Sequence, residues 1–302
     1  MNTKLSKSEV KALRQLCREG GNAGQVAHSL GMKNSFTSRI LARLKEKGLI
    51  DVKTEGSQKI IQLSVASHAQ NFKQLSDSRP EAKIEKWLSG YAMDILIVSV
   101  GGATTELVLK ESGCSHATFY KTLKSLAGAG ILFWKNGRVE ITDMLVDNFV
   151  SAYADNLQLI IQRGAKGLNT SIRVRKHVVL RTDAAPVPPF FTKTGLNALA
   201  EKGMEATMTS YKDYYFNLDQ KKKNVGTEEA FIHALLLTTL QQHQDMPVLT
   251  IFFAQNRRRL DLRALKEYAK LYLVEGAIDD IRQKTEFYEK MKNMTITEIY
   301  KR

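Results

Sequence analysis

The sequence contains little cysteine and no long apolar run, and both shortages restrict the class of protein. Its 302 residues include two cysteines, Cys17 and Cys114. Two isolated cysteines do not form a disulfide framework or a CxxC metal site, so we expect a reducing compartment and two buried thiols. No stretch of eighteen apolar residues is present, and residues 1–10 lack the apolar core of a signal peptide. We therefore expect a cytoplasmic protein without a membrane partner.

Motifs for common catalytic sites are also missing. The chain contains no G-x-x-x-x-G-K-[ST], G-x-S-x-G or H-E-x-x-H sequence, and no Cys/His cluster with the spacing of metal ligands. The sequence accordingly predicts no catalytic residues, no metal site, no cofactor and no enzyme. The enzymatic alternative is a metal-dependent nuclease, which needs carboxylate ligands. The carboxylates available for one are Asp183, Asp213, Glu228, Glu229 and Asp245. We interpret Glu228 and Glu229 instead as favourable charges in the first turn of a helix.

Positive charge is in excess, but it is unevenly distributed. The formal net charge is +14, which favours a polyanionic partner, and nucleic acid is the commonest of these. Residues 1–75 contain thirteen Lys and Arg against five Asp and Glu, whereas residues 76–155 contain eight against ten. The middle of the chain is therefore slightly acidic, and we expect residues 1–75 to provide more of the phosphate contacts.

The first segment has the pattern of three helices followed by a β-hairpin. Ser6 and Glu9 form a capping-box pattern at the start of the first helix. A second short helix ends at Gly31, and a third, "NSFTSRILARLKEKG", ends at Gly48. In this third helix we expect Phe36, Ile40, Leu41 and Leu44 to form the buried face. The alternating segments around Glu55-Gly56-Ser57 predict the hairpin.

The same pattern returns 82 residues later. Gly113 and Gly130 have the same separation as Gly31 and Gly48, and "ILFWKNGRVEIT" carries the Asn-Gly pair of a type I′ hairpin turn. We predict a long amphipathic helix over residues 81–100 before this second pattern and a linker over residues 76–80. The order of elements in each segment is that of a winged helix-turn-helix domain.

These two segments resemble winged helix-turn-helix transcription regulators of the MarR and ArsR kind, found in archaea and bacteria. The resemblance implies two winged helices in tandem. The fold class we predict is mainly α with β wings, followed by an α+β C-terminal domain. The predicted domains are residues 1–75, 76–165 and 166–302.

The third helix of the first segment has the residue types of a helix that enters the DNA major groove. There the N-terminal half of the helix contacts base edges, with arginine suited to guanine and asparagine to adenine. The candidates for base contact are Asn34, Ser35, Thr37, Ser38 and Arg39. The candidates for phosphate contact are Lys33 and Arg43 beside them and Lys53 and Lys59 on the wing.

The second segment offers a possible second DNA contact. The residues at the equivalent positions are His116, Thr118, Tyr120 and Lys121. Because an acidic domain neutralises phosphates poorly, we favour docking or dimerisation over base contact for this segment. The apolar stretch "MLVDNFVSAY", starting at residue 144, suggests helices that hold a homodimer.

The C-terminal third has a mixed pattern. "SIRVRKHVVLRT" predicts a strand, "TKTGLNALAEKG" a short helix, "TEEAFIHALLL" an apolar helix and "PVLTIFFA" a buried strand. In the order of its elements this region is similar to the C-terminal domain of AbiEi-type antitoxins, which are also winged-helix repressors. The resemblance implies autorepression and a partner toxin.

The sequence thus predicts a transcriptional regulator that acts as a repressor. We expect it to bind double-stranded DNA sequence-specifically, as a homodimer. Two alternatives stay open. One is an RNA-binding or basal transcription-machinery subunit, because tandem winged helices also occur there, and the other is the nuclease considered above.

Overall fold

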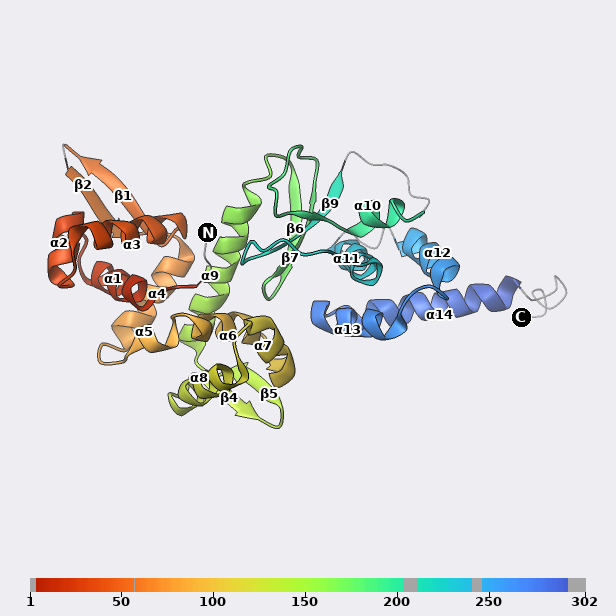
Figure 1. Ribbon diagram of the computed structural model, residues 1–302, viewed down its shortest axis with the longest axis horizontal. Helices are drawn as coiled ribbons and strands as arrows, with labels where there is room; N and C mark the ends of the chain where they lie inside the picture. Colours follow the sequence, from red (N-terminus) through yellow and green to blue (C-terminus); the bar gives the residue numbers. More distant parts are fainter. Residues whose placement is uncertain (1–3, 57, 204–210, 241–245, 293–302) are drawn as a thin grey trace. The chain divides into compact units, whose positions relative to one another are not determined.

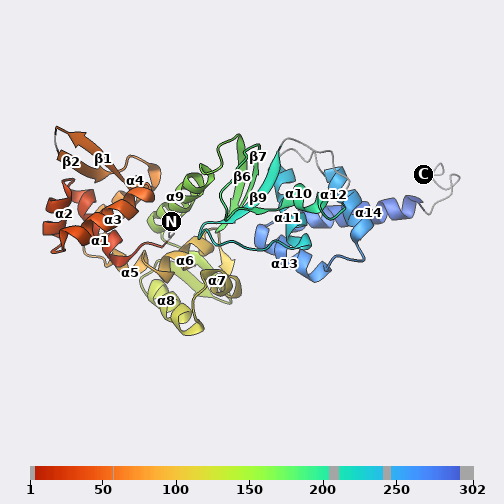
Figure 2. The same ribbon diagram turned by 45° about the horizontal axis from the view of Figure 1, so that its top comes forward.

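The computed structural model describes residues 4–56, 58–203, 211–240 and 246–292. These residues form fourteen helices and three small antiparallel sheets, so the described chain is mixed α and β with more helix than strand. It divides into two compact units, residues 1–161 and 162–302 (Figures 1 and 2). None of the helices within the described ranges is long and apolar enough to cross a membrane.

The first unit begins with three helices and a hairpin, in the predicted order. Helix α1 begins at the predicted capping box, in which Ser6 Oγ accepts from the Glu9 N–H and Glu9 Oε2 accepts from the Ser6 N–H. Before the second helix, Gly21 forms a single antiparallel bridge to Ile61 of the hairpin. The elements are α1 (Lys7–Arg18), α2 (Ala23–Ser29), α3 (Asn34–Glu46), β1 (Ile50–Glu55) and β2 (Gln58–Leu63).

The predicted repeat is present in the structure. Helices α7 and α8 and strand β4 begin at residues 105, 116 and 132, which is 82 residues after the starts of α2, α3 and β1 at 23, 34 and 50. Gly48 and Gly130, which follow the paired helices α3 and α8, have φ of 68° and 70°. Asn136 and Gly137 both have positive φ, as a type I′ turn requires. The elements are β3 (Ala103–Thr104), α7 (Thr105–Ser112), α8 (His116–Gly128), β4 (Leu132–Lys135) and β5 (Arg138–Ile141).

The single helix predicted over residues 81–100 is not formed. The chain instead forms α5 (Ile84–Trp87) and α6 (Tyr91–Ser99), with Gly90 between them at a φ of 59°. A residue in the left-handed region does not continue a right-handed helix, so a new helix starts after Gly90. Residues 92–99 of α6 are all buried. This helix is buried on every side, Asp94 and Ser99 included, because it lies inside the core, and so it lacks an amphipathic pattern.

The predicted linker, residues 76–80, is also corrected. Its first three residues belong to α4 (Ser67–Ser78), a helix that the sequence does not predict. Arg14 of α1 donates from Nη1 to the Ala82 carbonyl at 2.8 Å and from Nη2 to the carbonyls of Arg79 and Pro80. Arg79 also forms an ion pair with Asp143. The segment is therefore tied to α1 rather than free.

Helix α9 (Met144–Gln162) uses its apolar side within the first unit. Its Phe149 ring meets the Phe72 ring of α4 edge to face, with centroids 5.4 Å apart. Tyr153 is fully buried, and this burial, with the nearby carboxylates of Glu9 and Asp94, raises the pKa of its phenol well above the ordinary value. Val146, Phe149, Val150 and Tyr153 of the stretch that suggests a homodimer interface are thus buried within the chain's own unit, and Met144 is exposed, which weakens the reason for placing a dimer contact there.

The second unit contains an antiparallel sheet with the strand order β6-β7-β9-β8. The sequence predicts one strand over residues 171–182, but the chain turns at Arg175, whose φ is 56°, and forms a hairpin. Helix α11 (Thr227–Leu240) packs against β6 and β7 (Figure 1). The strands are β6 (Asn169–Val174), β7 (His177–Thr182), β8 (Thr192–Lys193) and β9 (Lys212–Asn217).

A helix replaces the buried strand predicted for "PVLTIFFA". This segment lies in α12 (Met246–Asn256), where Leu249, Phe252 and Phe253 are buried. A short, continuous apolar run fits a buried helix as well as a buried strand, and only the packing distinguishes them. The predicted short helix is present as α10 (Gly195–Ala200). Helices α13 (Leu262–Tyr272) and α14 (Glu275–Lys292) complete the described part of the unit.

Candidate nucleic-acid interface

Helix α3 separates its residues into a buried side and an exposed side. Ile40, Leu41 and Leu44 are buried in the core of the first unit, as predicted. The opposite side carries no Asp or Glu before Glu46. The predicted contact residues that are exposed here are Lys33, Asn34, Ser35, Ser38, Arg39 and Arg43.

Thr37 is the exception, because its side chain is fully buried and cannot reach DNA. It precedes Ile40, Leu41 and Leu44 by three, four and seven residues, and this spacing places it on the core side of the helix. Phe36, which the sequence assigns to the core, is 42% exposed instead. The polar Thr37 is therefore buried and the apolar Phe36 is exposed, which is the reverse of what hydrophobicity alone predicts.

The N-terminus of α3 is open. Its N-cap residue, Lys33, makes no side-chain hydrogen bond to the helix, and the first turn holds no acidic residue. By contrast, α1 and α2 each begin with a complete capping box. An exposed helix N-terminus with a neighbouring lysine favours an anion, because the N–H groups and the helix dipole both point toward it.

The side chains of two predicted base-contacting residues contact backbone carbonyl groups of their own helix, α3. Ser38 Oγ donates to the Asn34 carbonyl at 2.9 Å, and Arg39 Nε lies 3.4 Å from the Ser35 carbonyl. The Arg39 guanidinium is 5.9 Å from the centroid of the exposed Phe36 ring. The contact of Arg39 is long and involves only Nε, so a small change in torsion would present its guanidinium to another acceptor.

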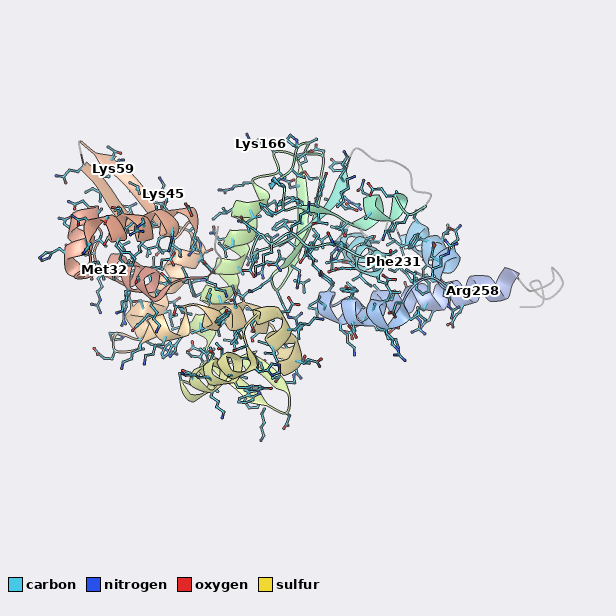
Figure 3. The ribbon with its side chains drawn as sticks, viewed as in Figure 1. Met32, Lys45, Lys59, Lys166, Phe231 and Arg258 are labelled. Atoms are coloured by element: carbon cyan, nitrogen blue, oxygen red, sulfur yellow. The ribbon has the colours of Figure 1, made fainter. Side chains whose placement is uncertain are left out.

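Lys53 and Lys59, predicted for the wing, are both exposed, but the β1–β2 hairpin places them on opposite faces. Lys53 pairs with Ile60, and Lys59 pairs with Thr54 in the next position of the register. Successive residues of a strand point to opposite faces, so Lys53 and Lys59 diverge. Figure 3 shows the side chains of this hairpin and of α3, with Lys59 and Lys45 labelled. If the β1–β2 hairpin entered a DNA groove, Lys53 and Lys59 would point toward opposite walls of the groove.

The C-terminal end of α3 is anchored by an ion pair that the sequence does not predict. Lys47 Nζ lies 2.6 Å from Glu9 Oε1 and also donates to the Lys4 carbonyl at 2.9 Å. Burial lowers the pKa of Lys47, and the hydrogen bond to Glu9 opposes that change. The Lys47 carbonyl meanwhile accepts from Asn156 Nδ2 of α9 and contacts His68 Nε2 of α4. These contacts fix α3 against three other helices of the first unit.

The predicted residues of the second repeat divide into two groups. Thr118 is half-buried and serves the cap of α8, since its N–H and its hydroxyl both contact Ser115 Oγ. His116, Tyr120 and Lys121 are exposed. His116 is a helix-start residue, as predicted.

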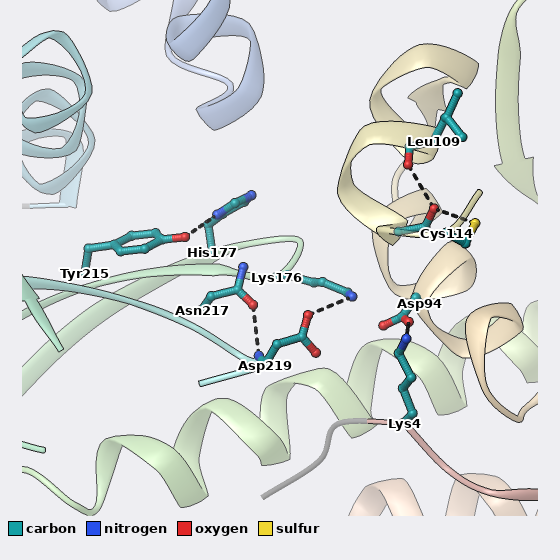
Figure 4. A network of polar contacts seen from close by, with 10 residues as sticks. Lys4, Asp94, Leu109, Cys114, Lys176, His177, Tyr215, Asn217 and Asp219 are labelled. Carbon is teal, nitrogen blue, oxygen red and sulfur yellow. Dashed lines mark hydrogen bonds and ion pairs between the residues drawn. The ribbon is translucent and has the colours of Figure 1, made fainter. Parts of the chain in front are cut away.

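The second unit buries a group of aromatic residues that sequence analysis missed. The His233 ring stacks on the Tyr215 ring with centroids 5.2 Å apart and meets the Tyr272 ring edge-on at 4.5 Å. Tyr215 Oη is 2.8 Å from His177 Nδ1 (Figure 4). The four side chains come from β7, β9, α11 and α13. Because they are far apart along the chain, no local pattern could reveal them.

Polar contacts complete this group. Glu229 Oε1 accepts from Lys223 Nζ at 2.6 Å and from Tyr272 Oη at 2.8 Å, and His233 Nδ1 lies 2.7 Å from Thr194 Oγ1. Burial, with additional effects of His177 and Lys223, lowers the pKa of His233 well below its ordinary value. The ring is therefore neutral at pH 7. This arrangement has the features of a hydrogen-bonded core rather than of an open site.

The carboxylates considered for a nuclease have other partners. Glu228 and Glu229 lie in the first turn of α11, as predicted, although Glu229 is buried. Asp245 lies outside the described residues. The remaining contacts are Asp183 with the Leu168 N–H, Asp213 with Arg181 and the Leu196 N–H, and Glu228 with the Asp261 N–H. Among the described residues, no three His, Cys, Asp or Glu side chains are grouped so that they could hold a metal ion.

The two cysteines are free thiols in different surroundings. Cys17 is buried, and burial is the main cause that raises its pKa to about 12. Cys114 is half-buried rather than buried as predicted, and its Sγ lies 3.2 Å from Ser112 Oγ. At neutral pH Cys17 is a protonated core residue, as the sequence predicts.

Comparison with known proteins gives no further guide. No family model matches the chain, and no curated protein matches it significantly.

Proposed function

We propose that the protein is a sequence-specific, double-stranded DNA-binding transcriptional regulator, acting as a repressor. In this proposal both repeats of the first unit are winged helix-turn-helix domains, and α3 is the helix that enters the major groove. The resemblance to MarR and ArsR regulators supports the same function.

One observation carries the proposal. The N-terminal half of α3 presents Asn34, Ser35, Ser38 and Arg39 together on an exposed surface, above a buried apolar side. Arginine and asparagine are the residues that distinguish guanine and adenine in the major groove, and short hydroxyl side chains contact bases or phosphates. The open helix end at Lys33 adds a phosphate site beside them.

The anchoring of α3 supports this role. The buried pair of Lys47 with Glu9 and the contacts of the Lys47 carbonyl hold the far end of the helix. A recognition helix has to be rigid, because base contacts depend on placing hydrogen-bonding atoms to within a fraction of an ångström.

We further propose that the regulator binds two half-sites as a homodimer, as symmetric repressors do. Because most of the apolar side of α9 is buried within the first unit, we place the dimer contact elsewhere. The second unit is the available candidate, and by its resemblance to AbiEi-type antitoxins it is also where a partner toxin would bind. Light scattering tests the dimer, since a mass of 34.0 kDa at every micromolar concentration, with and without DNA, contradicts it.

Competition binding tests the DNA-binding proposal. Fragments selected from the organism's own genomic DNA provide the preferred site, and bulk DNA at the same salt concentration provides the competitor. We expect a preference of about 10³-fold or more for the selected site. Equal affinity for both, or stronger binding to RNA, would favour the RNA-binding or basal-machinery alternative. Incubation of plasmid with Mg²⁺ or Mn²⁺ tests the nuclease, and cleavage abolished by EDTA would support it.

A further inference from the structure

The two repeats present different chemistry at equivalent positions. The offset of 82 residues places His116 where the first repeat has Asn34, and Tyr120 where it has Ser38. On the hairpin, Trp134 takes the position of Val52. Side chains suited to base edges in the first repeat are thus replaced by aromatic rings in the second. The two repeats thus share an order of elements but differ in the chemistry of these positions.

The three rings of the second repeat form a continuous stripe, which we call the aromatic stripe (His116, Tyr120 and Trp134). The centroids of His116 and Tyr120 are 6.3 Å apart, and those of Tyr120 and Trp134 are 5.8 Å apart. His116 and Tyr120 are exposed and Trp134 is half-buried. The neighbouring rings are tilted by 49° and 40°, so they do not cover one another's faces as parallel stacked rings do.

The charges around the stripe favour an anion. Helix α8 carries Lys121 and Lys124 and no Asp or Glu. Lys124 follows Tyr120 by four residues and so lies on the same side of the helix, and it is exposed. On the hairpin, Glu140 pairs with Phe133 and lies on the face opposite to Trp134. The carboxylate nearest in the hairpin register therefore points away from the stripe.

We propose that the second repeat binds single-stranded nucleic acid, with unpaired bases stacked on the aromatic stripe and Lys124 beside the backbone phosphate. In a duplex the faces of the bases are covered by their neighbours and only the edges are open, which suits the polar residues of α3. Aromatic side chains instead recognise base faces, which only unpaired nucleotides expose. This binding activity goes beyond the proposed recognition of duplex DNA by the first repeat.

Intrinsic fluorescence gives a direct test, because the chain contains only two tryptophans, Trp87 and Trp134. In the Trp87→Phe variant, all tryptophan emission comes from Trp134, and excitation at wavelengths that tyrosine does not absorb isolates it. Titration with oligothymidylate or oligouridylate of about 15 nucleotides, a length that spans the usual site sizes, is expected to quench this emission saturably. Comparison of the two oligonucleotides distinguishes DNA from RNA as the source of the strand. If neither oligonucleotide binds saturably, the proposal is overturned. Docking of a protein is then the remaining use for this surface.

Single substitutions distinguish the effect of base stacking on oligonucleotide binding from effects of misfolding and of lost charge. Tyr120→Leu keeps the apolar volume but removes the ring, and we expect it to raise Kd for the oligonucleotide by about 5- to 100-fold. Tyr120→Phe keeps the ring, and Kd should stay within about 2-fold of the wild-type value. Lys124→Ala should reduce the slope of log K against log salt by about 0.7, the value for one phosphate contact on a single strand.

Phe133→Ala is the matched control. Phe133 is an exposed aromatic residue of β4, the strand that carries Trp134, but it lies on the opposite face of the hairpin. We expect this substitution to leave oligonucleotide binding unchanged. Equal losses in Phe133→Ala and Tyr120→Leu would overturn the proposal, as would loss of oligonucleotide binding in Arg39→Ala but not in Tyr120→Leu. Arg39→Ala should weaken binding to the preferred duplex site and leave oligonucleotide binding unchanged, so failure of this proposal is distinguishable from failure of the proposed regulator function.

Discussion

Lys47 at the end of α3 and Glu9 in the first turn of α1 form a buried ion pair, with Nζ 2.6 Å from Oε1. Their side chains are only 3% and 2% exposed. Each also has a second partner, because Lys47 donates to the Lys4 carbonyl and Glu9 accepts from the Ser6 N–H. The pair thus joins the start of α1 to the end of α3 through charges that water does not screen.

We predict that removing one member of this pair strongly destabilises the first unit. Lys47→Met leaves the Glu9 carboxylate buried without its counter-charge, and we expect a loss of about 3 to 5 kcal/mol in the free energy of unfolding. The double substitution Glu9→Met with Lys47→Met should cost less than either single change, because no unpaired charge then stays buried. Urea unfolding followed by circular dichroism measures both.

Lys45→Met is the control for this prediction, because Lys45 is exposed on the same helix and its removal should change stability by no more than about 0.5 kcal/mol. A Lys47→Met variant as stable as Lys45→Met would show that the ion pair does not hold α3.

We predict that Arg39→Ala weakens binding to the preferred DNA site by about 1 to 3 kcal/mol while binding to random DNA changes little, as base recognition requires. Fluorescence anisotropy with both kinds of DNA at one salt concentration measures this difference. The control is Lys45→Ala, which removes a charge from the last turn of α3, away from the residues assigned to bases. Equal losses on specific and random DNA would make Arg39 a phosphate contact at most.

We predict a salt dependence that differs between the two hairpins. Because Lys53 and Lys59 lie on opposite faces of the first hairpin, each should contribute its own phosphate contact, and each single alanine variant should reduce the slope of log K against log salt by about 0.9. The double variant should reduce it by about 1 to 2 per protomer. Replacement of Lys135 and Arg138 in the second hairpin should change the slope for duplex DNA by well under one. A larger effect of the second hairpin would contradict the assignment of the first repeat as the main duplex-binding domain.

We predict that acid destabilises the second unit through His233. Its pKa in the folded protein is depressed well below the ordinary value of 6.5, mainly by burial. As the pH falls below 6.5, the unfolded chain takes up a proton that the folded chain does not, so the free energy of unfolding decreases, by up to about 1.4 kcal/mol per pH unit. Well above pH 6.5 this dependence vanishes, because His233 is then neutral in both states.

Urea unfolding between about pH 7.5 and 5 checks this sign through the slope of stability against pH. His233→Gln should flatten the slope even if it lowers stability at every pH, because the titrating group is gone. His116→Gln, at an exposed histidine, serves as the control and should keep the wild-type slope. An unchanged slope in His233→Gln would contradict the prediction.

Much of the local structure could be predicted because it depends on residues close together in the chain. The capping box at Ser6 and Glu9, the helix stops at Gly48 and Gly130, and the hairpin turn at Asn136 all follow from short-range hydrogen bonds and backbone sterics. The errors arose where local signals conflict or are ambiguous. An apolar run alone did not distinguish helix α12 from a strand, and "SIRVRKHVVLRT" contained no turn signal strong enough to reveal its hairpin.

The sequence by itself determined the 82-residue repeat, the position of α3 and the exposure of Arg39 and its neighbours, because helical spacing and glycine stops are properties of contiguous residues. Helical spacing also allows Thr37 on the core side, but only the tertiary structure decided that Phe36 faces the solvent and that most of the apolar side of α9 is covered by its own chain. It also decided which polar groups are buried. Glu9 and Lys47 are separated by 38 positions and His177 and Tyr215 by another 38, and whether such groups are charged, neutral or paired depends on which distant side chain the fold brings to them.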